Sequence, residues 1–246
     1  MHDNCNHATE LYHLPGFYEP FSAISHLAGA VLFLILGYLL LKRGRGEKTR
    51  MILLGVYVAS SVLLMSMSGV YHMVERGGTA HRVFERLDHA SIVIFIAGTF
   101  TAAHGLVFAR HHRWFPLAFV WIVAITGVTL RTIFFDDLPE EVGLVFYLAL
   151  GWVGFGSVVV LWRRYNFHFV AFVLWGGLAY SIGAVAEYLC WPVPIPGVIH
   201  SHEVFHLAAL VGAFCHWLFL WRVATGELPL PRVRKLAEVL TTDKHR

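Results

Sequence analysis

Charged residues are scarce in this chain: only 14% of its 246 residues are Asp, Glu, Lys or Arg, whereas 57% are hydrophobic. A soluble globular domain typically carries about 25% charged residues, so this composition excludes a water-soluble protein. The net charge of +3 does not indicate a nucleic-acid partner. The sequence has no low-complexity segment and no convincing internal repeat, so we expect a single membrane-embedded unit.

Cysteines are also few, and the N-terminus lacks basic residues. Cys5, Cys190 and Cys215 form no metal-binding or redox motif. Cys5 and Cys190 are expected at the same membrane face, but the sequence does not favour a disulfide between them. The first 21 residues contain no Lys or Arg, unlike the basic n-region of a secretory signal. We therefore expect the first apolar run to be a retained membrane anchor.

Seven apolar runs are long enough to span a bilayer, which requires about 20 residues of helix. They cover residues 22–41, 51–72, 88–109, 114–134, 142–162, 168–190 and 201–222. The predicted fold is therefore all-α, a polytopic membrane protein with a bundle of seven transmembrane helices. This domain covers residues 22–222, between a polar N-terminal tail (1–21) and a basic C-terminal tail (223–246).

Basic residues are distributed unequally between the two ends of these spans. Of the 19 Lys and Arg residues, 15 fall on the face that includes the C-terminal tail. The other face receives Arg76, Arg82, Arg86 and Arg131. Cytosolic loops carry the excess of Lys and Arg. We therefore expect a multi-pass protein of the plasma (inner) membrane with its N-terminus outside and its C-terminus in the cytosol.

Three histidines are expected at the face that has few basic residues. His202 and His206 begin the seventh span and lie one helical turn apart on the same side, while His72 ends the second span. Ionisable side chains are costly in hydrocarbon unless they have partners, so this cluster indicates a functional site. Three imidazoles with an open fourth position are typical of catalytic zinc. Copper and iron also accept imidazole ligands.

Other polar residues are expected beside these histidines. Asp88 opens the third span and is a candidate proton acceptor, although it could instead cap that helix or pair with Arg86. Ser68 lies one turn before His72, and its alternative role is a hydrogen bond to its own helix. Glu187, near the end of the sixth span, belongs either to the site or to the solvated interface.

Glu203 is a second candidate proton acceptor. It completes a His-Glu-x-x-His string with His202 and His206, which is the zincin signature. His26 is expected to form a structural hydrogen bond, and His104 and His216 are expected to be packing residues.

Several segments together resemble the hemolysin III family, the bacterial branch of the progestin and adipoQ receptor superfamily. The first four are Glu19–His26, Ser68–His72, Arg86–His89 and Ala97–Thr101. Tyr147–Trp152 and His202–His206 follow, the latter with Gly212 and His216 behind it. The resemblance covers nearly the whole chain.

This resemblance implies a seven-helix fold with zinc bound by His72, His202 and His206. It also implies that Ser68 and Asp88 contact the zinc water, so that Asp88 rather than Glu203 activates it. In the related adiponectin receptors and alkaline ceramidases, such a site is associated with hydrolysis of lipid amides such as ceramide. The receptors place the N-terminus and the zinc face in the cytosol, opposite to the orientation that the charges predict here.

The leading hypothesis is a zinc-dependent hydrolase that acts on a lipid amide or ester, with membrane lipids such as a sphingolipid-like amide as substrates. The first alternative is a membrane sensor or receptor with a structural zinc. Further alternatives are a membrane-lytic protein, a zincin-type membrane protease and a pore. No repeated polar stripe favours a pore, and no downstream ligand motif favours a protease. The sequence does not indicate an oligomeric state.

Overall fold

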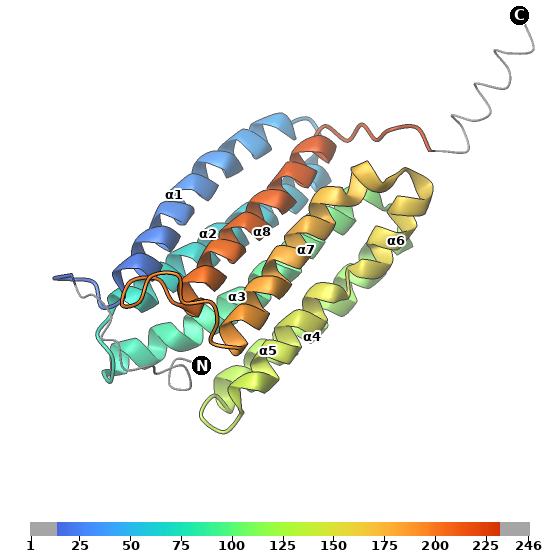
Figure 1. Cartoon of the computed structure of the whole chain (residues 1–246). Helices are drawn as coiled ribbons and strands as arrows, with labels where there is room; N and C mark the ends of the chain where they lie inside the picture. The colour runs from blue at the N-terminus through green and yellow to red at the C-terminus, as the bar shows by residue number, and fades with distance from the viewer. Residues whose placement is uncertain (1–13, 232–246) are drawn as a thin grey trace, which may run out of the picture.

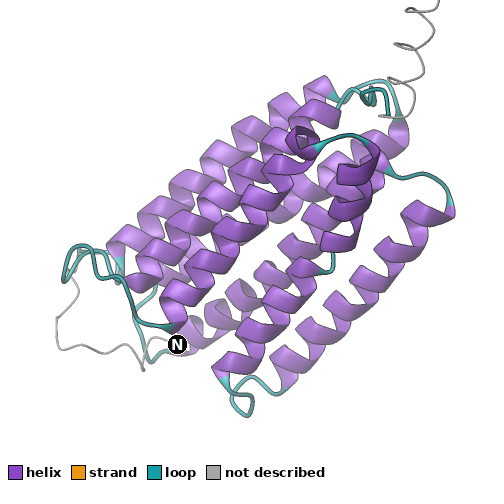
Figure 2. Ribbon diagram, turned by 45° about the vertical axis from the view of Figure 1, so that its right-hand side comes forward, coloured by secondary structure: helices purple, strands orange, loops and turns teal. Residues whose placement is uncertain are grey.

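The computed structural model describes residues 14–231, and Cys5 and most of the C-terminal tail lie outside them. The described chain forms a bundle of helices connected mostly by short loops (Figures 1 and 2). In chain order these are α1 (Pro20–Arg43), α2 (Lys48–Met73), α3 (Thr79–Val107), α4 (His111–Ile133), α5 (Glu140–Trp152), α6 (Phe155–Arg164), α7 (Phe167–Tyr188) and α8 (Ser201–Val223). No strand occurs between residues 14 and 231, apart from two isolated bridges in loops.

Seven helical segments are long and apolar enough to cross a membrane, which confirms the predicted number of spans. The fifth span, Glu141–Arg164, contains both α5 and α6, because the helix is interrupted by a turn at Val153 and Gly154. Such a break is tolerated within a membrane where neighbouring groups satisfy the freed backbone. The backbone N–H of Val153 still bonds to the carbonyl oxygen of Ala149 at 3.1 Å.

The third helix begins earlier than the sequence predicted. The predicted span starts at Asp88, whereas α3 starts at Thr79 and has Gly78 as its N-cap residue. The first two turns contain the charged residues Arg82 and Glu85. This part of the helix is therefore not apolar enough to be predicted as part of a membrane span. Asp88 therefore lies well inside α3, and the alternative role of capping this helix is wrong.

The main core of the bundle is formed mainly by buried side chains of α1, α2, α3, α7 and α8. The Tyr57 hydroxyl of α2 donates to the Ala213 carbonyl oxygen of α8 at 2.8 Å, and the Trp217 indole of α8 donates to the Leu36 carbonyl oxygen of α1 at 3.0 Å. Close approach also needs small residues. A Cβ on Gly212 would lie 2.6 Å from the Tyr180 ring, so this glycine allows α7 and α8 to meet.

The outer helices present large apolar side chains away from the bundle. Phe115 and Ile122 of α4 and Val145 of α5 are mostly exposed. A soluble protein rarely exposes so much contiguous apolar surface. Lipid would cover these side chains, as expected for an integral membrane protein.

The two ends of the bundle differ in chemistry. The start of α1, the end of α2, the end of α7 and the start of α8 meet at one end (Figure 1). Arginines gather at the other end, where Arg43 donates to the Trp221 carbonyl oxygen and Arg50 to the Thr225 carbonyl oxygen. The polar residues discussed below lie at the first of these ends.

The cysteines differ in state. Cys190, just beyond α7, is disulfide-bonded, whereas Cys215 of α8 is a free thiol. The prediction that disfavoured a disulfide is therefore wrong for Cys190.

Candidate metal centre

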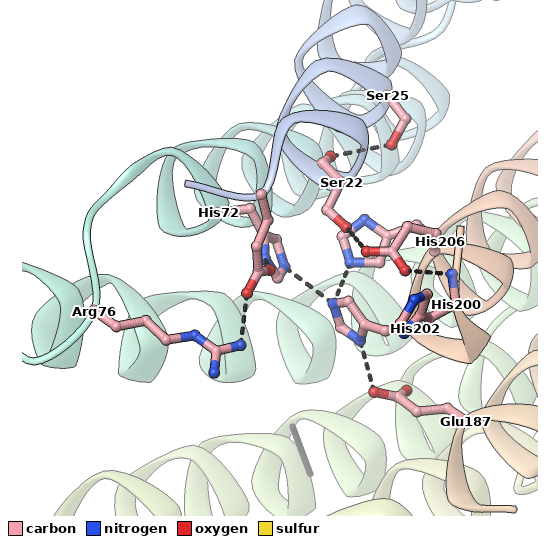
Figure 3. A network of polar contacts seen from close by, with 10 residues as sticks. Ser22, Ser25, His72, Arg76, Glu187, His200, His202 and His206 are labelled. Carbon is pink, nitrogen blue, oxygen red and sulfur yellow. Dashed lines mark hydrogen bonds and ion pairs between the residues drawn. The ribbon is translucent and has the colours of Figure 1, made fainter. Parts of the chain in front are cut away.

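The three predicted histidines converge. His72 lies in the last turn of α2, and His202 and His206 lie in the first two turns of α8. The Nε2 atom of His202 is 3.2 Å from that of His72 and 2.9 Å from that of His206 (Figure 3). One ligand atom from each residue lies within 4.8 Å of the other two, as a shared ion would require. The predicted convergence of the three side chains is present in the structure, and their role as metal ligands stays a prediction.

The spacing of the three nitrogens fits a metal ion. Tetrahedral zinc with Zn–N bonds of 2.0–2.1 Å would place its nitrogen ligands about 3.3–3.4 Å apart. The observed separations are slightly shorter, so small side-chain adjustments are enough to reach that geometry. Three histidines without a cysteine are also typical of zinc sites that leave one position open. The residues present therefore fit the ion that the fold family implies.

The Nδ1 atoms of two of these histidines meet carboxylates. His72 Nδ1 contacts Glu19 Oε2, and His202 Nδ1 lies 2.7 Å from Glu187 Oε1. A carboxylate only accepts hydrogen bonds, so each Nδ1 carries a proton, and in the neutral form of each ring the Nε2 atom then presents a lone pair. Two such lone pairs at 3.2 Å would repel each other, so the contact requires either a metal ion bound by both nitrogens or a second proton on one ring. The arrangement is therefore one that suits a bound ion.

Glu19 is held in place by the main chain and by an arginine. Its backbone N–H donates to the His72 carbonyl oxygen at 2.9 Å, and its Oε1 accepts a hydrogen bond from Arg76 at 2.7 Å. The backbone N–H of Tyr18 donates a hydrogen bond to the Met73 carbonyl oxygen at 3.3 Å. We refer to the segment Tyr18–Glu19, held on the end of α2, as the α2 clamp.

In the sequence Glu19 stands out as the first residue of a segment that carries the family resemblance, and no role was predicted for it. Its signal was present in the sequence: an acidic residue directly before Pro20 and an apolar run. Arg76 was counted only as a loop charge. Its contact with Glu19 depends on the α2 clamp, which no spacing rule predicts.

Asp88 and Ser68 lie deeper in the same region, and both are buried. Asp88 lies close enough to His202 and to the Ser68 hydroxyl to interact with both. The Asp88 Oδ1 atom is buried and has no hydrogen-bond partner among the described residues. Arg86 pairs with Asp136 at 2.9 Å, which leaves no support for an ion pair between Arg86 and Asp88. An orphaned carboxylate oxygen beside the histidines suits a group that handles a proton.

Glu203 is occupied elsewhere. Its Oε1 accepts a hydrogen bond from Ser22 of α1 at 2.9 Å, and its Oε2 accepts one from the backbone N–H of His200 at 2.9 Å. The second contact caps the start of α8, in the manner of a capping box. Both oxygens are engaged in joining and starting helices, which favours Asp88 over Glu203 as the proton acceptor.

The remaining histidines take other roles. The His26 ring stacks on His206 with 3.8 Å between centroids, and its Nε2 lies 3.4 Å from the His206 carbonyl oxygen. His104 bonds to Ser157 and to the His112 carbonyl oxygen near the opposite end. His216 packs on Tyr180. None of the three belongs to the metal-binding group found among the described residues.

Comparison with known proteins identifies the family. The model of the haemolysin-III-related family matches residues 17–217, which is most of the chain and includes the whole cluster. The chain belongs to this family. It is 28% identical over 194 residues to Hemolysin-3 of Bacillus cereus, which covers 78% of this chain and 85% of the relative. The predicted resemblance is thereby confirmed.

Relatives from eukaryotes place this hemolysin III protein in the wider progestin and adipoQ receptor superfamily. It is 23% identical over 236 residues to the Adiponectin receptor protein of Drosophila melanogaster, covering 84% of this chain and 52% of the relative. It is 27% identical over 196 residues to Heptahelical transmembrane protein 1 of Arabidopsis thaliana, covering 70% of this chain and 58% of the relative. The hemolysin III chain thus spans little more than half the length of these two relatives.

Proposed function

We propose that this protein is an integral membrane zinc hydrolase that cleaves a lipid amide or ester. The observation that carries the proposal is the convergence of three histidine Nε2 atoms beside the orphaned Asp88 carboxylate. An ion would relieve the repulsion between the His72 and His202 lone pairs. The cluster lies at the end of the spans, where the polar headgroup and the apolar chain of a lipid meet.

In this proposal His72, His202 and His206 hold the ion. When bound, zinc supplies Lewis-acid polarisation of a carbonyl and lowers the pKa of a water molecule. The Asp88 carboxylate accepts a proton from the attacking water, which forms the new C–O bond. Asp88 then returns that proton to the nitrogen or oxygen that leaves as the C–N or C–O bond breaks. Ser68 holds the Asp88 carboxylate in place through its hydroxyl.

A second candidate is a membrane receptor or sensor in which the metal is structural. The name of the Drosophila relative, an adiponectin receptor protein, favours it. A lytic activity is suggested only by the name of the Bacillus cereus relative. A zincin-type protease is less well supported, because both Glu203 oxygens already accept hydrogen bonds, from Ser22 and from the His200 N–H, and are not free to accept a proton from water.

We also propose that the metal centre faces away from the cytosol. The charge distribution supports this orientation, since 15 of the 19 Lys and Arg residues belong to the opposite face. Cys190 adds a second argument, because it lies at the metal end and is disulfide-bonded. Disulfides persist in oxidising compartments and are rare in the cytosol.

The deciding experiment combines metal analysis with a lipid panel. Purified protein in nanodiscs is assayed for one zinc per chain and for fatty-acid release from ceramide-like amides and from esters. Release that depends on zinc and on Asp88 supports the hydrolase. A zinc-loaded protein that releases nothing across the panel supports the receptor instead.

A further inference from the structure

We propose that Glu19 and Glu187 are positioning residues for the metal centre. Each holds one ligand histidine in the tautomer and ring orientation that binds an ion. The inference rests on the metal-binding part of the proposed function and is independent of whether the protein hydrolyses lipids.

Glu19 is built into a fixed position beside His72. It directly precedes α1, yet its side chain does not cap that helix. The carboxylate instead turns toward α2, where one oxygen contacts His72 Nδ1 and the other accepts a hydrogen bond from Arg76. The α2 clamp fixes the backbone of Glu19 on the same helix end. Helix capping therefore does not explain this buried side chain.

Glu187 reaches His202 from a different element. It lies in the last turn of α7 and is only 7% exposed, although it is a carboxylate in an apolar helix. Its Oε1 lies 2.7 Å from His202 Nδ1 across the tightly packed α7–α8 pair. Burying a carboxylate at such a place is costly unless it has a specific partner. The partner it meets is a ligand histidine.

The two contacts have the same chemical consequence. A carboxylate that accepts the Nδ1 proton fixes the tautomer in which Nε2 carries the lone pair. It also prevents rotation of the ring and makes Nε2 a stronger donor to a metal. In both histidines that Nε2 points at the other ligands. Glu19 and Glu187, which come from separate parts of the chain, thus orient His72 and His202 so that both Nε2 atoms face the same metal position.

The carboxylates also supply charge. Three neutral imidazoles bring none to a divalent ion, and an uncompensated ion is unfavourable in apolar surroundings. Glu19 and Glu187 each place a negative charge on the far side of a ligand ring. Arg76 shares Glu19, so Glu187 is expected to contribute more of the compensation.

His206 is oriented differently from the other two ligands. Its ring stacks on His26 with an interplanar angle of 21°, so packing helps hold it. We therefore expect the positioning role to be confined to Glu19 and Glu187 rather than to extend to every acidic residue at this end.

The test measures metal affinity rather than turnover. Full-length protein and the variants Glu19→Gln, Glu187→Gln, Glu19→Ala and Glu187→Ala are purified in nanodiscs. Zinc affinity is measured by competition with a chelator, and the absorption spectrum of bound Co²⁺ reports the ligand geometry. Each variant should bind zinc about 10–100-fold more weakly than the intact chain. Ala should be worse than Gln, because Gln keeps an acceptor oxygen.

Glu85→Gln is the matched control. Glu85 lies on α3 at the same end, and within residues 14–231 its side chain forms no hydrogen bond to the three histidines. Its variant should keep the affinity and the Co²⁺ spectrum of the intact chain. Thermal unfolding of each variant without metal separates weak binding from loss of fold. If an Ala variant does not fold, the corresponding Gln variant, whose side chain has nearly the same shape as Glu, tests the positioning role instead.

The outcomes separate this inference from the proposed function. If the intact chain binds neither Zn²⁺ nor Co²⁺, the metal-binding proposal fails and the positioning role fails with it. If the intact chain binds zinc and the folded Gln and Ala variants bind equally well with unchanged Co²⁺ spectra, only the positioning role is overturned. A similar loss in Glu85→Gln would also overturn it, because the effect would then be one of general charge.

Discussion

Ser22, near the start of α1, donates a hydrogen bond to Glu203, near the start of α8, and so joins the first and last helices of the bundle. The two residues are separated by 181 positions in the sequence and are both buried. This contact uses one oxygen of the glutamate that the zincin-like string offers as a general base. It gives Glu203 a structural reason to be present.

The first prediction concerns this contact. Glu203→Gln should lower the free energy of unfolding by about 1–3 kcal/mol, the usual cost of disturbing a buried hydrogen-bonded group. Ser22→Ala should have a similar effect, and the double variant should be less destabilised than the sum of the two. Thermal unfolding in detergent measures all three. Zinc content should stay near one per chain, and a zinc-free but folded Glu203→Gln protein would contradict the structural role.

The second prediction concerns the ligands. Replacing His72, His202 or His206 with Ala should sharply reduce zinc occupancy, because two remaining imidazoles hold the ion poorly. Metal analysis of the purified variants measures this. His216→Ala serves as the control, and His26→Ala, which removes the ring stacked on His206 but no ligand, should also keep the stoichiometry of the intact chain. Nearly full occupancy in His206→Ala would rule out the assigned ligand set.

The third prediction concerns proton transfer in the proposed hydrolysis. Asp88→Asn should reduce the rate about 10²–10⁴-fold, the usual contribution of a general base, while zinc stays bound. Release of fatty acid from a ceramide-like amide measures the rate, with occupancy checked for each variant. Glu203→Gln should cost much less activity. A large loss in Glu203→Gln with Asp88→Asn nearly unaffected would reverse the assignment and favour a zincin-like site.

The fourth prediction concerns orientation. A reporter that is active only in the cytosol should be active when fused to the C-terminus, since the C-terminal face carries most of the Lys and Arg residues. The same reporter fused to the N-terminus should be silent. Activity at the N-terminus of a well-inserted protein would place the metal centre at the cytosolic face, which is the orientation that the family resemblance implies.

Much of the fold could be predicted because hydrocarbon imposes a simple rule on composition. Each membrane span is an apolar run of sufficient length, so all seven spans could be predicted. The rule fails where a helix extends beyond the hydrocarbon. The charged start of α3 was therefore missed, and Asp88 was placed at a helix end. The interruption of the fifth span at Gly154 depends on tertiary packing, and no local pattern marks it.

The histidine cluster was predictable for a different reason. His202 and His206 are related by helix geometry alone, and His72 follows from counting which span ends share a face. The contacts of Glu19 with His72 and Arg76 were not predictable, because they depend on main-chain hydrogen bonds between the α2 clamp and α2. The engagement of Glu203 by Ser22 joins residues 181 positions apart, which is equally hidden from local patterns.

The order of the ligands along the chain has a consequence for biosynthesis. His72 is synthesised 130 residues before His202, so at about 5–20 residues per second it waits roughly 7–26 s for its partners. During that interval Glu19, which is already made and which Arg76 then holds, can accept the Nδ1 proton of His72 at the membrane surface. The centre is completed only when the final helix inserts. In a cell, the fraction of these chains that bind metal would therefore follow the fraction that has completed membrane insertion.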